Sequence, residues 1–106
     1  MAFLNTSELP SRELFPGVNA KLIHTDKVTI AHVTLDKGAV VHEHSHMHEQ
    51  IINVLEGTFE LTLDGETRTV TAGYVAVVPS NVKHALTVTA AGKILDLFSP
   101  VREDLK

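Results

Sequence analysis

Turn-forming residues divide this 106-residue chain into short segments, and this division restricts the possible folds more than any other feature of the sequence. Turn signals recur about every 8 to 12 residues, and the segments between them are rich in valine, isoleucine, threonine and leucine. None has the length and apolar periodicity of a helix. The expected strands are residues 21–24, 28–35, 39–42, 50–55, 58–63, 67–71, 74–78, 84–89 and 93–99. About nine short strands without a helix predict one all-β domain, an antiparallel sandwich or barrel.

The pair Asp64-Gly65 gives the clearest local prediction. It is a strong signal for a two-residue hairpin turn, because both residue types accept a positive φ. On its N-terminal side Phe59, Leu61 and Leu63 alternate with polar residues. This alternation predicts a half-buried strand that enters a tight hairpin.

The beginning of the chain has a different character. Residues 1–19 contain Pro10, Pro16 and Gly17 and show no sustained periodicity. They are expected to form an N-terminal arm over the surface or over a partner subunit, and residues 20–106 are expected to form the β-domain. The apolar residues of the arm need a surface to cover, and a small open barrel leaves sheet edges exposed. A homodimer is therefore expected.

Composition argues against several classes of partner. The formal net charge is -4, and no basic run or aromatic platform for nucleic acid is present. The N-terminus lacks the basic start and apolar segment of a signal peptide, and no stretch approaches the ~18 apolar residues of a membrane span. There are no cysteines, hence no disulfide framework. We expect a soluble, cytoplasmic protein that binds neither nucleic acid nor membrane.

The chemistry of the chain is concentrated in residues 42–50. Four of the seven histidines lie at positions 42, 44, 46 and 48, and Gln50 continues the alternation. On an extended strand these side chains would share one face, but the ends would lie roughly 26 Å apart, whereas a metal ligand lies about 2 Å from its ion. Only neighbours two residues apart can therefore share an ion directly. Further ligands must follow a turn at residues 47–49 or come from elsewhere in the chain.

Without thiolates, any metal in this protein must be held by nitrogen and oxygen, which suits Zn, Mn, Fe, Ni or Cu. The structural alternative for the histidine run is a solvated polar loop that binds metals loosely.

Asp96 is the second candidate for chemistry. It shares one face of an apolar strand with Ile94 and Phe98, where an unpaired carboxylate costs several kcal/mol of desolvation. Asp96 should therefore face a polar cavity or a cation. Arg102 follows Pro100 closely enough to reach the mouth of a barrel, and the alternative is an ordinary structural salt bridge between Asp96 and Arg102.

These residues resemble the two motifs of the cupin family. Gly38, five residues, His44, one residue, His46, three residues, Gln50, six residues and Gly57 resemble the first motif; Gly73, five residues, Pro79 and then His84 resemble the second. The resemblance implies a single-domain jelly-roll β-barrel with His44, His46, Gln50 and His84 around one divalent transition metal such as Zn, Ni, Mn or Fe. The sequence departs from the motifs at Gln50, where most cupins carry glutamate, and at Asn81, where they carry glycine.

Three imidazoles and an amide would form a neutral ligand shell. Such a shell leaves the charge of the ion uncompensated, which favours polarising a substrate over redox chemistry. Glu49 or Glu43 is an alternative to Gln50 if the loop folds differently, and His48 and His42 are further candidate ligands.

The segment from Asp96 to Asp104 resembles that of the small cupins of pectin degradation, which convert 4,5-unsaturated monouronates from pectin or alginate to linear keto acids. The resemblance implies a metal-dependent enzyme for an anionic sugar, with Asp96, Phe98 and Arg102 in its active site. Here three residues separate His46 from Gln50, where that family is expected to have four. The alternatives are another metal-dependent cupin enzyme (dioxygenase, lyase or sugar isomerase) and a non-enzymatic ligand-binding cupin.

Overall fold

The computed structural model describes residues 1–106, which form eight strands and two single turns of 3-10 helix. The elements are η1 (Thr6–Glu8), β1 (Arg12–Phe15), β2 (Val18–His24), β3 (Thr29–Leu35), β4 (Val40–His44), β5 (Glu49–Leu63), β6 (Glu66–Val70), β7 (Val75–Val78), β8 (His84–Ser99) and η2 (Glu103–Leu105). The prediction of an all-β domain is confirmed. Neither helical turn has the length or apolar character needed to cross a membrane.

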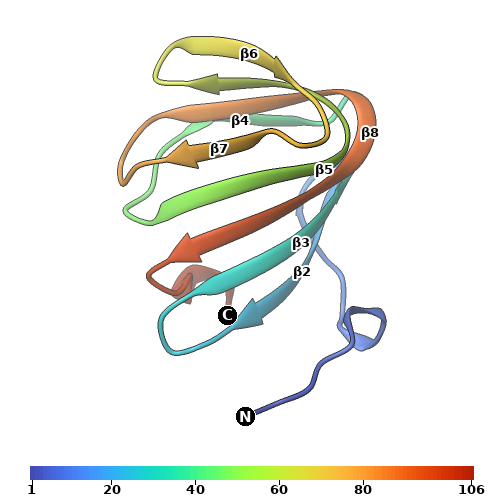
Figure 1. Ribbon diagram of the computed structural model, residues 1–106, viewed down its shortest axis with the longest axis vertical. Coiled ribbons are helices and arrows are strands. Elements are labelled where there is room, and N and C mark those ends of the chain that lie inside the picture. The colour runs from blue at the N-terminus through green and yellow to red at the C-terminus, as the bar shows by residue number, and fades with distance from the viewer.

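Two long strands, β5 and β8, organise the sheet. They pair antiparallel from Glu49 opposite Ser99 to Leu63 opposite His84. In the half formed by the beginning of β5 and the end of β8, β7 pairs with β5, and β3, followed by β2 and β1, pairs with β8. In the other half, β6 pairs with β5 and β4 pairs with β8. The sheet curls so that the two halves face each other, as Figure 1 shows.

A pair of glycines marks the bend between the halves. A Cβ on Gly92 would overlap the carbonyl oxygen of Glu56, and a Cβ on Gly57 would lie 2.7 Å from the Cα of Gly92. Both positions therefore require glycine for the close approach of the two backbones. The predicted breaks at residues 56–57 and 90–92 are wrong: the chain bends there, with shifts of register, but the strands continue.

The hairpin predicted at Asp64-Gly65 is confirmed. Both residues have a positive φ, 47° and 83°, and they connect β5 to β6. The alternation before the turn also has the predicted effect, because Phe59 and Leu61 are buried. One face of β5 thus contributes to the core between the two halves of the sheet.

The core is apolar and lies inside the curl. It comprises sixteen buried residues, among them Phe59 and Val88, which lie opposite each other in the β5–β8 pair, and Val78 on β7. Ala20, Ala31, Val33 and Ile94 continue it across β2, β3 and β8. At the open end this apolar lining gives way to polar side chains, which include four buried residues, Thr29, Gln50, His84 and Asp96.

The range expected to form an arm contains a strand. Residues Arg12–Phe15 form β1, which pairs with β2 through Arg12 opposite Ala20 and Phe15 opposite Val18. Phe3 and Leu4, further upstream, are exposed. Strand β1 brings Arg12 to the open end of the curl, where it becomes part of the site described next.

Candidate active site

A cavity of about 330 Å³ occupies the open end of the curled sheet. Thirteen of its twenty-two lining residues are hydrophobic, and its polar side chains come from β1, β4, the loop after β4, β5, β8 and the residues after β8. The polar set comprises Arg12, Glu13, His44, His46, Gln50, His84, Asp96, Arg102 and Asp104. An apolar cavity with a few converging polar groups is the usual form of a small-molecule site.

Three histidines converge on one side of this cavity. His44 and His84 are opposite each other in the β4–β8 pair, and His46 follows β4 by two residues. Their ring nitrogens offer three ligand atoms within 4.8 Å of one another. The rings of His44 and His84 are 4.3 Å apart between centroids, and those of His46 and His84 are 4.8 Å apart.

Backbone carbonyls fix the orientation of all three rings. His44 Nδ1 lies 2.8 Å from the carbonyl oxygen of His42, His46 Nδ1 lies 2.9 Å from that of His48, and His84 Nδ1 lies 2.9 Å from that of Val82. Because a carbonyl only accepts, each Nδ1 carries the hydrogen and donates it. The Nε2 lone pair is then left free to bind a metal.

The electrostatics of the cluster also favour a cation. Burial lowers the pKa of His46 and that of His84, which keeps these rings neutral and able to donate a lone pair. The buried His84 Nε2 has no hydrogen-bond partner. An orphaned acceptor in a cluster of neutral imidazoles fits a divalent transition metal.

Gln50 lies beside this cluster at the beginning of β5. It is buried, and its Oε1 is 3.1 Å from His46 Nε2. With Nδ1 of His46 protonated, both of these atoms are acceptors, and a cation in contact with both would satisfy them. A bend at residues 47–48 brings Gln50 back toward His46, so the spacing of three residues suffices to place the amide at the cluster.

The other candidate ligands lie elsewhere. His42, Glu43 and Glu49 are exposed, and none of them lines the cavity. His48 is partly buried, with its ring centroid 5.6 Å from that of His46, and its Nδ1 has no partner. It does not line the cavity either.

Asp96 faces the cavity from β8. Its side chain is buried, and its Oδ1 has no hydrogen-bond partner. Burial raises the pKa of Asp96 from 3.8 to about 7, although the Gln50 amide and the positive charge of Arg102 act in the opposite direction. A carboxyl group of this kind exchanges a proton readily near neutral pH.

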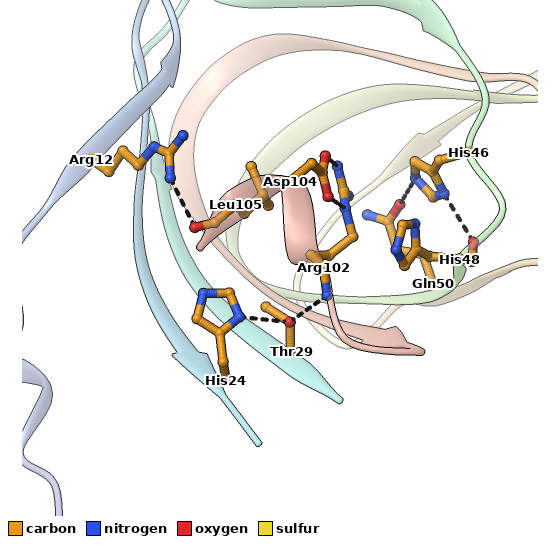
Figure 2. Close-up of polar contacts among 9 residues, drawn as sticks. All are labelled: Arg12, His24, Thr29, His46, His48, Gln50, Arg102, Asp104 and Leu105. Atoms are coloured by element: carbon orange, nitrogen blue, oxygen red, sulfur yellow. Dashed lines mark hydrogen bonds and ion pairs between the residues drawn. The ribbon is translucent and has the colours of Figure 1, made fainter. Parts of the chain in front are cut away.

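Arg102 is held at two points, by Thr29 and by Asp104 (Figure 2). Its backbone N–H donates to Thr29 Oγ1 at 2.8 Å, and its guanidinium pairs with Asp104 at 2.8 Å. The guanidinium also lies over the ring of Phe98, 4.7 Å from the centroid. The structural alternative, a salt bridge between Asp96 and Arg102, is not formed.

Four residues of the site have no counterpart in the sequence motifs. They are Arg12, Thr29, Asp104 and Leu105: Arg12 donates to the carbonyl of Leu105 at 2.8 Å, and Thr29 Oγ1 also contacts His24 Nδ1 at 2.8 Å. Only Asp104 could have been inferred locally, because it lies two residues after Arg102. The contact of Thr29 with Arg102 and that of Arg12 with Leu105 join residues 73 and 93 positions apart in the chain, and no local pattern encodes them.

Comparisons with known proteins agree with this geometry. Residues 31–98 match the Cupin domain family. The pectin degradation protein KdgF of Dickeya dadantii is 35% identical over 100 residues, spanning 92% of this chain and 91% of that protein. The structure of KdgF from a Halomonas species superposes with a TM-score of 0.92 at 33% identity, over 100% of this chain and 99% of the other.

A further structure shows the same fold across the whole chain. A cupin of the RmlC-like type from Shewanella frigidimarina superposes with a TM-score of 0.94 at 29% identity, covering 100% of this chain and 96% of its own. The predicted resemblance and the predicted jelly-roll fold are therefore confirmed. With its family-defining segment, its fold and its histidine cluster all in agreement, the chain belongs to the cupin family.

Proposed function

We propose that this protein is a metal-dependent enzyme of pectin or alginate breakdown, which opens the ring of 4,5-unsaturated monouronates to give linear 4-deoxy-5-keto acids. One observation carries the proposal. A buried carboxyl group with a free oxygen, Asp96, shares a cavity with a guanidinium and with three histidines suited to a metal. The similarity to two proteins called KdgF, one of them described as a pectin degradation protein, supports the same substrate class.

The metal would be held by His44, His46 and His84, with Gln50 as the fourth ligand. All four groups are neutral donors, and they leave the full charge of a divalent ion available to a substrate. Bound there, such an ion supplies Lewis acidity that stabilises negative charge developing on substrate oxygens.

Arg102 and Phe98 would orient the sugar. A guanidinium matches the two oxygens of a carboxylate with two parallel hydrogen bonds, which suits Arg102 to the carboxylate of a uronate. Phe98 lines the cavity beside the guanidinium and would present an apolar surface to the ring of the sugar. These contacts would place the unsaturated carbons near Asp96, which lines the same cavity.

Asp96 would carry the proton. In the proposed reaction the bond between C1 and the ring oxygen breaks, the C1 hydroxyl loses a proton, and C4 gains one as the C5 enol becomes a ketone. The conversion is an isomerisation and needs no oxidant or reductant. A pKa of about 7 leaves Asp96 able both to give and to take this proton at neutral pH.

The direct test follows the ultraviolet absorbance of the conjugated double bond in unsaturated galacturonate, mannuronate or guluronate. We expect an enzyme-dependent decay that chelation abolishes and metal restores. No decay above the spontaneous rate, in protein shown to contain metal, would exclude this function and direct attention to dioxygenase, lyase or isomerase chemistry.

The Asp96→Asn variant tests the proton carrier. We expect kcat to fall by about 100-fold or more, with unchanged metal content, because general acid–base catalysis typically contributes at least that factor. Full activity in this variant would remove Asp96 from the mechanism.

A further inference from the structure

Arg102, the proposed partner of a substrate carboxylate, already binds a carboxylate of its own chain. Its Nε donates to Asp104 Oδ1 at 3.0 Å, and its Nη2 donates to Asp104 Oδ2 at 2.8 Å. This two-pronged arrangement is the one by which a guanidinium recognises any free carboxylate. Asp104 therefore occupies one edge of the group that a uronate would need (Figure 2).

The two partners differ in how firmly they are held. The backbone of Arg102 is fixed to Thr29, a fully buried residue, and only 14% of the Arg102 side chain is exposed. The Asp104 side chain is 58% exposed, and the turn that carries it, η2, contains no buried residue. If the pair separates, Asp104 and its turn are the part that moves.

Few contacts hold η2 against the body of the protein. Besides the Asp104 pair, Arg12 Nη1 donates to the carbonyl of Leu105 at 2.8 Å from across the mouth of the cavity. Asp104 and Leu105 both line the cavity, so η2 forms part of its wall at the open end of the sheet. Release of η2 breaks the exposed hydrogen bond from Arg12 and the two hydrogen bonds from Arg102, and a ligand carboxylate would restore the latter two.

The charges of Arg102 and Asp104 would make the replacement of Asp104 by a ligand selective for carboxylates. The hydrogen bonds from Arg102 lower the pKa of Asp104 to about 2, so Asp104 is ionised at neutral pH and the pair carries no net charge. A ligand carboxylate that approaches Arg102 meets the negative charge of Asp104. If it replaces Asp104, the guanidinium keeps a bidentate anionic partner, whereas a neutral sugar has no group that could take over this role.

We propose that Asp104 is a specificity-determining residue: it occupies Arg102 until the carboxylate of a uronate replaces it, and this exchange releases η2 from the mouth of the cavity. The inference rests on the proposed function in that it takes a uronate as the ligand. It adds a residue and an order of events to the binding step.

The test measures the mobility of η2 by NMR relaxation of the Asp104 and Leu105 amides in the metal-loaded protein. Galacturonate is the probe, because it carries the carboxylate but lacks the double bond, and galactose is its neutral counterpart. We expect galacturonate to increase the mobility of both amides and galactose to leave it unchanged. Failure of galacturonate to bind, or binding that leaves η2 rigid, would overturn the proposal.

Two variants distinguish competition between Asp104 and the ligand for Arg102 from a role of Asp104 in positioning Arg102. Asp104→Asn removes the competing charge and should lower the dissociation constant for galacturonate about two- to fivefold, while η2 becomes mobile without ligand. Glu103→Gln makes the same change of charge in the same turn, where Glu103 pairs only with Lys106, and should leave the constant unchanged. Weaker binding by Asp104→Asn would show that Asp104 positions Arg102, which would refute the competitive role.

Because galacturonate lacks the reacting double bond, it tests the replacement of Asp104 independently of the proposed ring-opening reaction. If galacturonate releases η2 but unsaturated uronates are not converted, the carboxylate exchange stands and the ring-opening function fails. If unsaturated uronates are converted while η2 stays rigid, the opposite conclusion holds.

Discussion

Replacement of Asp96 by asparagine should stabilise the metal-free protein at alkaline pH, although it removes the proposed proton carrier. Asp96 is buried with an unpartnered oxygen. Ionising Asp96 in the folded protein therefore costs free energy and lowers the stability of the fold. Asparagine has the same shape and no charge. The variant should thus lose activity and gain stability, the reverse of what a mutation in a well-packed core produces.

The pKa of Asp96 determines the size and the sign of this difference in stability between the variant and the wild type. Below its ordinary pKa of 3.8 the group is protonated in both the folded and the unfolded chain and has no effect. Between 3.8 and about 7 the folded state binds more protons, so stability falls as pH rises; above about 7 the full cost, about 4 kcal/mol, is present. The advantage of Asp96→Asn should therefore grow from about 2 kcal/mol near pH 5 to about 4 kcal/mol near pH 8.

Urea unfolding in the presence of a chelator, followed by circular dichroism because the chain has no tryptophan, measures this difference. The matched control is Asp26→Asn, which removes the same charge from an exposed turn and should keep the pH dependence of the wild type. A stability difference for Asp96→Asn that does not change with pH, or a variant less stable than wild type near pH 8, would refute the argument that Asp96 is buried at a cost.

Other residues of the site and the bend yield three further predictions. His84→Ala should lower the metal content of purified protein more than about tenfold, measured by mass spectrometry, while the fold is retained. Thr29→Val leaves the N–H of Arg102 without its acceptor; we expect a loss of about 1–3 kcal/mol in urea unfolding and a higher KM for the uronate, both reversed in Thr29→Ser. Gly92→Ala should not fold, because its Cβ would overlap the carbonyl of Glu56; a soluble variant with cooperative unfolding would contradict this contact.

Turn residues and alternation predicted most of the strands of this fold, but not β1, and not how glycine acts at each position. Gly65 and Gly57 both have a positive φ, at 83° and 92°, yet the first ends a strand and the second lies within one. The difference comes from a tertiary contact, the approach of Gly57 to Gly92. No local pattern reports such a contact, so two long strands were predicted as four short ones.

The candidate site was predictable where its chemistry is unusual for its surroundings. A cluster of histidines and a carboxylate in an apolar strand are both uncommon, and both could be identified in the sequence as candidates for a functional site. The structure brings His44, His46, His84 and Asp96 to one cavity. Arg12 and Thr29 are ordinary residues in their strands. Their importance arises only because the fold brings them to the residues around Arg102.

The way the three imidazoles are oriented has a consequence for how such a protein can diversify. Each ring is anchored by a carbonyl only two residues away in its own segment, and His44 and His84 face each other through a single register of β4 and β8. The geometry of the histidine cluster is therefore encoded by two short stretches of backbone, independently of the side chains across the cavity. Mutation or design can thus change the opposite wall of the cavity while the arrangement of the three histidines is retained.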